Sequence, residues 1–95
     1  MQIDYPEVRQ LAEAVAEEYP GRMNDDVFYS APCFVGEILN RLDIQVPDKY
    51  DGTRFSRIPW ARIGDHTFTM GAISFLQRIQ DRTDKGSMWG EAIDS

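Results

Sequence analysis

The side chains in this sequence best suited to covalent chemistry are one thiol and one imidazole. Cys33 is the only cysteine and His66 the only histidine among the 95 residues. Cys33 falls in the first turn of a predicted helix, where free backbone N–H groups and the helix dipole favour a thiolate, and His66 could serve as its base. A thiol enzyme is therefore one alternative. Because no third residue or oxyanion motif is recognisable, we expect instead a small buried thiol, an unrelated histidine and no catalytic residue.

Metal binding has less support still. One cysteine and one histidine cannot complete a tetrahedral zinc site without carboxylates. The stretch DKYDGTRF carries acids at its first and fourth positions, whereas an EF-hand loop alternates its ligands and ends in glutamate. We interpret Asn24-Asp25-Asp26 as a polar turn rather than a cation site. The sequence therefore predicts neither a metal nor a cofactor.

A segment of mixed basic and aromatic residues, DKYDGTRFSRIPWAR, has the residue types that are enriched at protein interfaces. The residues predicted to bind a partner are Lys49, Tyr50, Arg54, Phe55, Arg57, Trp60 and Arg62. The same mixture suits base stacking on single-stranded nucleic acid. In a third interpretation the aromatic side chains turn inward to fill the core, and the arginines pair with acids of the first helix. Exposure of Trp60 distinguishes these interpretations.

The charge of the chain is negative and unevenly distributed. Sixteen acidic and ten basic residues give a net charge of −6. Residues 1–26 hold seven acids and two arginines, whereas residues 48–66 hold four basic residues and three acids. A field of this sign repels phosphate backbones. We therefore expect a protein as partner rather than nucleic acid, with a nucleic-acid-directed regulator, either an acidic mimic or a loop-mediated binder, as the alternative.

The acidic face of the first predicted helix could serve such mimicry. It consists of Glu13, Glu17 and Glu18. Like charges one turn apart mildly destabilise a helix, so their presence favours a functional role for the charge. The plainer interpretation is a solvated helix surface.

Two helical patterns occupy the first half of the chain. Residues 4–21 repeat apolar side chains at helical spacing, and Asp4 and Glu7 could form a capping box at the start. Residues 30–42 predict a second helix that begins at Ser30 and pairs Glu37 with Arg41 one turn later. The apolar face of the second helix carries Val35, Ile38, Leu39 and Leu42.

Two more helices are predicted in the second half. Residues 65–82 form the longest, capped by Asp65 or Thr67, and Gly71 could mark a close helix crossing. Gly86 ends this region, and Ser87 is placed to cap a short terminal helix. Its anchor is Trp89, whose burial would contribute about 3 kcal/mol. The inward residues of the longest helix are Phe68, Ala72, Phe75, Leu76 and Ile79.

The expected fold is mostly α: one compact domain over residues 1–95, with about four short helices and one long irregular loop. Part of the loop at residues 43–64 should form a helical turn or a minimal hairpin around Asp51-Gly52. No apolar run approaches the roughly 18 residues of a membrane span, and the first residues lack the features of a signal peptide. Together with the single cysteine, this predicts a cytoplasmic protein.

Two segments, PCFVGEILNRLDI and FLQRIQDRTDKGSMWGEAI, form a pattern. A Cys-x-x-Gly helix ends in Arg-Leu, and later come Leu-x-x-x-Gln-x-x-Asp, a glycine and Trp-Gly-x-Ala. This resembles small uncharacterised proteins of actinobacteria and their phages, over less than half of the chain. The resemblance implies a compact helical fold and no activity to inherit. We accordingly expect a small non-catalytic protein-binding domain, phage-encoded and acting on a host protein, that could also form a homodimer.

Overall fold

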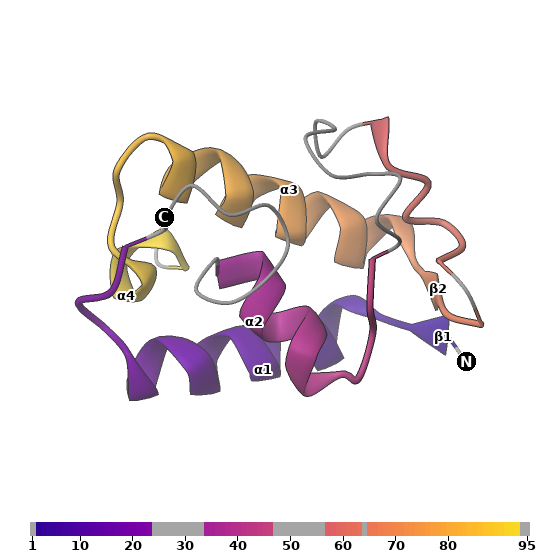
Figure 1. Ribbon diagram of the computed structural model, residues 1–95, viewed down its shortest axis with the longest axis horizontal. Coiled ribbons are helices and arrows are strands. Elements are labelled where there is room, and N and C mark those ends of the chain that lie inside the picture. The colour runs from indigo at the N-terminus through magenta and orange to yellow at the C-terminus, as the bar shows by residue number, and fades with distance from the viewer. Residues whose placement is uncertain (1, 24–33, 47–56, 64, 94–95) are drawn as a thin grey trace.

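The structure, a computed structural model, describes residues 2–23, 34–46, 57–63 and 65–93. Within these ranges lie four helices and two strands of two residues each (Figure 1). In chain order they are β1 (Gln2–Ile3), α1 (Tyr5–Glu18), α2 (Phe34–Arg41), β2 (Thr67–Phe68), α3 (Met70–Asp84) and α4 (Trp89–Ala92). The radius of gyration is 12.0 Å, which is what a compact chain of this length should have. The predicted mostly α, single-domain fold is confirmed.

Helix α1 forms because apolar side chains recur along one face. Val8, Ala12, Val15 and Ala16 are buried on that face. Asp4 is the N-cap, as predicted, but not through a capping box. Its carboxylate accepts from the Tyr5 N–H at 2.8 Å, and the Glu7 N–H bonds the backbone carbonyl of Asp4 instead of its side chain. The helix ends at Glu18 and its C-cap is Tyr19, directly before Pro20 and Gly21.

Helix α3 begins later than the sequence pattern indicates. Its N-cap is Thr69, whose hydroxyl accepts from the Ala72 N–H at 3.3 Å, so the prediction of Asp65 or Thr67 as the cap is wrong. The reason is tertiary: Thr67 and Phe68 form β2, which pairs with β1, and a residue in an extended strand cannot also start a helix. The predicted inward residues are nevertheless all buried, with Phe68 supplied by the strand.

The two strands set the relation between α1 and α3. They pair in parallel, with Gln2 opposite Thr67 and Ile3 opposite Phe68. Each is followed at once by a helix, so α1 and α3 start side by side and run in the same direction (Figure 1). Gly71 lies at this junction, where an added Cβ would be 3.4 Å from the Cβ of Tyr5. Gly71 therefore lies where α3 meets the start of α1, but at an ordinary van der Waals distance that does not require glycine.

Helix α2 packs against both α1 and α3 (Figure 1). Its predicted apolar face is buried at Val35, Ile38 and Leu39. The expected pair one turn apart also forms, since Arg41 Nε lies 3.3 Å from Glu37 Oε1. The predicted start of this helix at Ser30 lies outside the described residues.

The chain then returns to α1 through α4. Gly86 has a φ of 99°, a left-handed conformation that favours glycine, and ends α3 as predicted. Trp89 is fully buried and its ring stacks on Phe34 with centroids 5.0 Å apart, which confirms it as the anchor. The cap, however, is Met88 rather than Ser87, and no side chain caps this helix.

Backbone groups from the end of α1 replace the missing cap. The N–H of Trp89 donates to the carbonyl of Arg22 at 2.8 Å, and the N–H of Gly90 donates to the carbonyl of Pro20 at 3.0 Å. These are N–H groups that have no partner within the helix itself. Because carbonyls 67 and 70 positions away satisfy them, a capping hydroxyl is not needed, and the sequence signal for Ser87 is misleading.

Candidate protein interface

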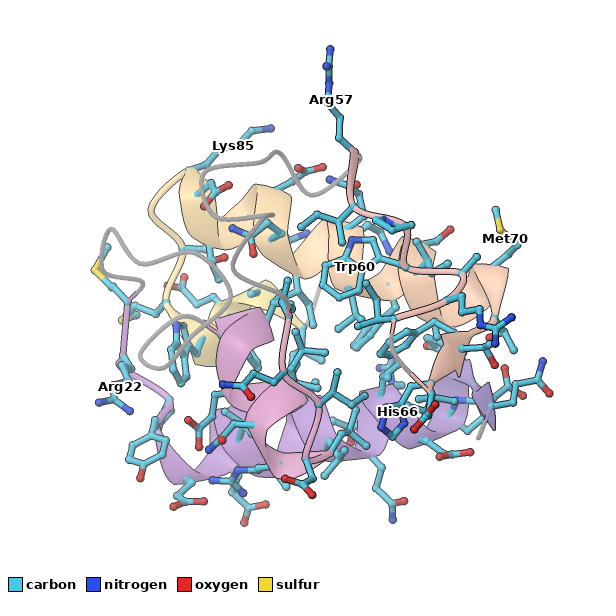
Figure 2. The ribbon with its side chains drawn as sticks, turned by 45° about the vertical axis from the view of Figure 1, so that its right-hand side comes forward. Arg22, Arg57, Trp60, His66, Met70 and Lys85 are labelled. Atoms are coloured by element: carbon cyan, nitrogen blue, oxygen red, sulfur yellow. The ribbon has the colours of Figure 1, made fainter. Side chains whose placement is uncertain are left out.

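The described part of the basic and aromatic segment splits between core and surface. Trp60 is 3% exposed and meets Phe68 edge-on, with ring centroids 5.9 Å apart. The interpretation in which the aromatic side chain turns inward therefore holds for Trp60. Arg57 and Arg62 are exposed, and Figure 2 shows Arg57 pointing away from the body of the protein.

The other members of this predicted interface lie outside the described residues, as does the predicted hairpin around Asp51-Gly52. They are Lys49, Tyr50, Arg54 and Phe55. Neither Arg57 nor Arg62 forms an ion pair with an acid of α1 within the described ranges. Of the predicted interface residues that the structure describes, Trp60 is therefore in the core, and Arg57 and Arg62 are at the surface.

The other residues singled out for chemistry give no assembled site. Cys33 and the Asn24-Asp25-Asp26 turn lie outside the described residues. His66 is half-buried and its backbone pairs with that of Ile63, while its buried Nδ1 has no hydrogen-bond partner within the described structure. No group of three or more potential metal ligands occurs among the residues that the structure describes. None of the described helices has the length and apolar character needed to cross a membrane.

A different surface stands out where α1 ends and α4 begins. Four exposed residues make it up, and we call it the tyrosine–methionine patch: Tyr19, Arg22, Met23 and Met88. Tyr19 is 37% exposed, Met23 51% and Met88 38%. Of the described residues, Met70 is the remaining exposed large apolar side chain, and Figure 2 shows it at the opposite end of the molecule from Arg22.

The patch is held on a rigid aromatic base. The Arg22 guanidinium lies 4.7 Å from the centroid of the Tyr19 ring and 5.3 Å from that of Trp89. The Tyr19 and Trp89 rings meet edge-on, with centroids 6.2 Å apart. Cation–π contacts and a buried indole beneath restrict the Tyr19 and Arg22 side chains before any partner arrives.

Beside the patch runs a groove of about 350 Å³ between α1 and α4. We call it the α1–α4 groove; it is lined by Glu13, Ala16, Glu17, Pro20, Gly90 and Ile93. Four of these residues are apolar and two are acidic. Because Pro20 directly follows Tyr19, the groove and the patch are continuous along the chain.

The three glutamates of the acidic face have different surroundings. Glu13 Oε1 accepts from Arg9 Nε at 2.9 Å, and Glu18 Oε2 accepts from the Arg41 guanidinium at 2.5 Å. The Arg41 hydrogen bond holds the pKa of Glu18 below its ordinary value. Glu17 forms no ion pair with a described residue. Among the described residues, the acidic face is therefore partly neutralised by Arg9 and Arg41, and Glu17 is its member without an ion pair.

Sequence reasoning did not find this surface. The apolar spacing of residues 4–21 continues to Tyr19 and so predicts that its ring faces inward, and the two methionines follow no helical period. The available signal was their position beside helix ends, next to Arg22 and Trp89. Compared with family models, curated proteins and solved structures, the chain shows no match. What its fold and surface define is a small, mostly α domain with an exposed aromatic and methionine patch.

Proposed function

We propose that this chain is a small non-catalytic protein-binding domain that docks a partner protein through the tyrosine–methionine patch. The observation that carries the proposal is the gathering of exposed large apolar side chains at the junction of α1 and α4. Among the described residues, Tyr19, Met23 and Met88 lie there and Met70 alone lies elsewhere. Single exposed apolar residues need no explanation, whereas a cluster of them does.

The chemistry of the patch suits an interface centre. Tyrosine, methionine and arginine are enriched there relative to the rest of protein surfaces. Tyr19 and Arg22 are already ordered over Trp89, so binding loses less side-chain entropy. The flexible methionines can adapt to the shape of a partner. A rigid centre with an adaptable edge is a good basis for specific binding.

The partner belongs to the same proposal. The resemblance to actinobacterial and phage proteins makes a host protein of an actinobacterium the first candidate. Arg57 and Arg62, exposed and unpaired with described acids, form a second region that such a partner could reach. The experiment must therefore separate the patch from these arginines.

A pull-down from actinobacterial lysate with tagged variants makes that separation. Met23→Lys/Met88→Lys places charge in the patch, and Met70→Lys is the matched control because Met70 is 75% exposed at the far end of the molecule. Arg57→Glu/Arg62→Glu tests the basic region. Circular dichroism and thermal unfolding first establish that all variants fold.

We expect one host protein to be retained by the parent, by Met70→Lys and by the arginine variant, and lost by the patch variant. Loss with the arginine variant alone would move the interface to the 57–62 region. Equal capture by every variant would contradict a patch interface. Capture of nothing by the parent would remove the protein-binding proposal for this host.

A further inference from the structure

We propose that the α1–α4 groove receives a lysine or arginine side chain of the bound partner, so that the partner segment is basic as well as apolar. This inference rests on the proposed function, because it names the chemistry of the segment that lies on the neighbouring patch. It assigns a role to two glutamates of the acidic face, Glu13 and Glu17.

One wall of the groove consists of residues on one face of α1 and of the residue that follows its C-cap. Glu13, Ala16 and Glu17 lie three and four positions apart, which places them on one side of α1, and Pro20 extends this wall just beyond the end of the helix. Gly90 and Ile93 form the opposite wall. The two glutamate carboxylates are thus the charged groups of a groove whose other lining residues are apolar.

This arrangement suits a long basic side chain better than a small ion. Lysine and arginine bury an apolar stem and keep the charged head near water. Here Ala16, Pro20 and Ile93 offer the apolar surface, and Glu17 offers a carboxylate without an ion pair to a described residue. Glu13 uses Oε1 for Arg9, and its side chain is still 56% exposed. The carboxylate of each glutamate can therefore accept a further hydrogen bond.

The groove is already formed, because the two walls are fixed to each other. The Gly90 N–H donates to the Pro20 carbonyl at 3.0 Å. An added Cβ at position 90 would lie 2.9 Å from that same oxygen, so the walls approach as closely as glycine permits. A basic side chain can enter without opening the fold.

The net charge of the whole molecule also favours a basic occupant. The net charge of −6 attracts a basic segment over long range and repels an acidic one. At the patch itself Arg22 is engaged by the Tyr19 and Trp89 rings. An occupant with apolar residues for the patch and a basic residue for the groove therefore meets complementary surfaces at both places.

Synthetic peptides test the inference directly. One fluorescein-labelled peptide is rich in leucine and lysine, and its counterpart has every lysine replaced by glutamine. Binding is followed by fluorescence anisotropy, and amide NMR shifts of Glu17 and Gly90 report on the groove. The test variant is Glu13→Gln/Glu17→Gln. The control, Glu7→Gln/Asp81→Asn, removes the same charge outside the groove.

We expect the lysine peptide to bind the parent and shift both amides, the test variant to bind it about tenfold more weakly, and the control to stay within about twofold. If the test and control variants bind the lysine peptide equally weakly, the peptide is attracted by net charge alone, and the proposed role of the groove is wrong. Equal binding of the glutamine peptide, or no saturable shift up to about 1 mM peptide, would also overturn it.

The same variants keep this inference separate from the proposed function. If the patch variant loses its lysate partner while Glu13→Gln/Glu17→Gln retains it with unchanged affinity, the docking patch stands and the basic anchor is wrong. If both lose it and the control keeps it, both proposals stand. If neither loses it, both proposals fail.

Discussion

The Thr69 hydroxyl donates a hydrogen bond to Asp4 Oδ1 at 2.9 Å, across a sequence separation of 65 residues. Each residue is the N-cap of its own helix, Asp4 for α1 and Thr69 for α3. The Thr69 N–H also bonds the Ile3 carbonyl at 3.0 Å, which extends the pairing of β1 with β2. One short network therefore starts both long helices and fixes them beside each other.

We predict that Thr69→Val destabilises the protein by about 1–2 kcal/mol, because it removes a helix cap and a partner of Asp4 while keeping the side-chain shape. Urea unfolding followed by circular dichroism measures the change. Thr69→Ser keeps the hydroxyl and should cost much less. A double-mutant cycle with Asp4→Ala should show coupling, and strictly additive effects would mean that the side-chain contact contributes nothing.

Two helical glycines, Gly71 and Gly90, should respond in opposite ways to alanine. Gly90→Ala should destabilise by about 1–3 kcal/mol, because its Cβ would press on the Pro20 backbone, which cannot move aside cheaply. Gly71→Ala should be neutral or stabilising by up to about 1 kcal/mol, since its Cβ meets Tyr5 at an ordinary distance. Thermal unfolding of both variants measures these changes. Similar losses of stability at the two positions would contradict this packing.

Trp60 should act as a core residue in mutagenesis. Because its side chain is buried against Phe68, we predict that Trp60→Ala costs about 3–5 kcal/mol, a large share of the stability of a small domain. Arg57→Ala, at an exposed position close by in the sequence, should change stability by less than about 0.5 kcal/mol. Chemical denaturation compares the two. A Trp60→Ala protein of parental stability would place the indole outside the core.

The Glu18 to Arg41 ion pair should give stability a dependence on acid. The folded-state pKa of Glu18 lies below its ordinary value of 4.5, chiefly because Arg41 donates a hydrogen bond to it. Its contribution is therefore present above the ordinary pKa and is lost as pH falls through the lowered folded pKa. The urea midpoints of the parent and of Glu18→Gln should converge as pH falls through this window.

Glu17→Gln provides the control for this experiment. Glu17 is the neighbouring exposed glutamate and forms no ion pair with a described residue. Its removal should leave the acid dependence of the parent in place. If the gap between the parent and Glu18→Gln stays constant through the acid range, the hydrogen bond to Arg41 does not contribute in solution.

Helical spacing in the sequence predicted α1, α2, α3 and the Trp89 helix, with their buried faces. These could be predicted because the buried face of a helix places apolar residues every three to four positions, a pattern visible in a short stretch of sequence. Helix starts were less predictable. Serine, threonine and aspartate near a helix all resemble caps, and only their tertiary partners select one. Thus Thr69, rather than Asp65 or Thr67, caps α3, because β2 pairs with β1 and the helix begins only after this strand.

The sequence by itself determined a mostly α domain and the residues that build its core, since both follow from local periodicity. Only the tertiary structure decided that the Trp60 ring faces inward, because an irregular segment has no period to show which way a side chain turns. It alone also brought Tyr19 and Arg22 of the α1 end to Trp89 near the far end of the described chain. The candidate interface exists because backbone carbonyls at Pro20 and Arg22 hold α4 there, a contact that no local pattern encodes.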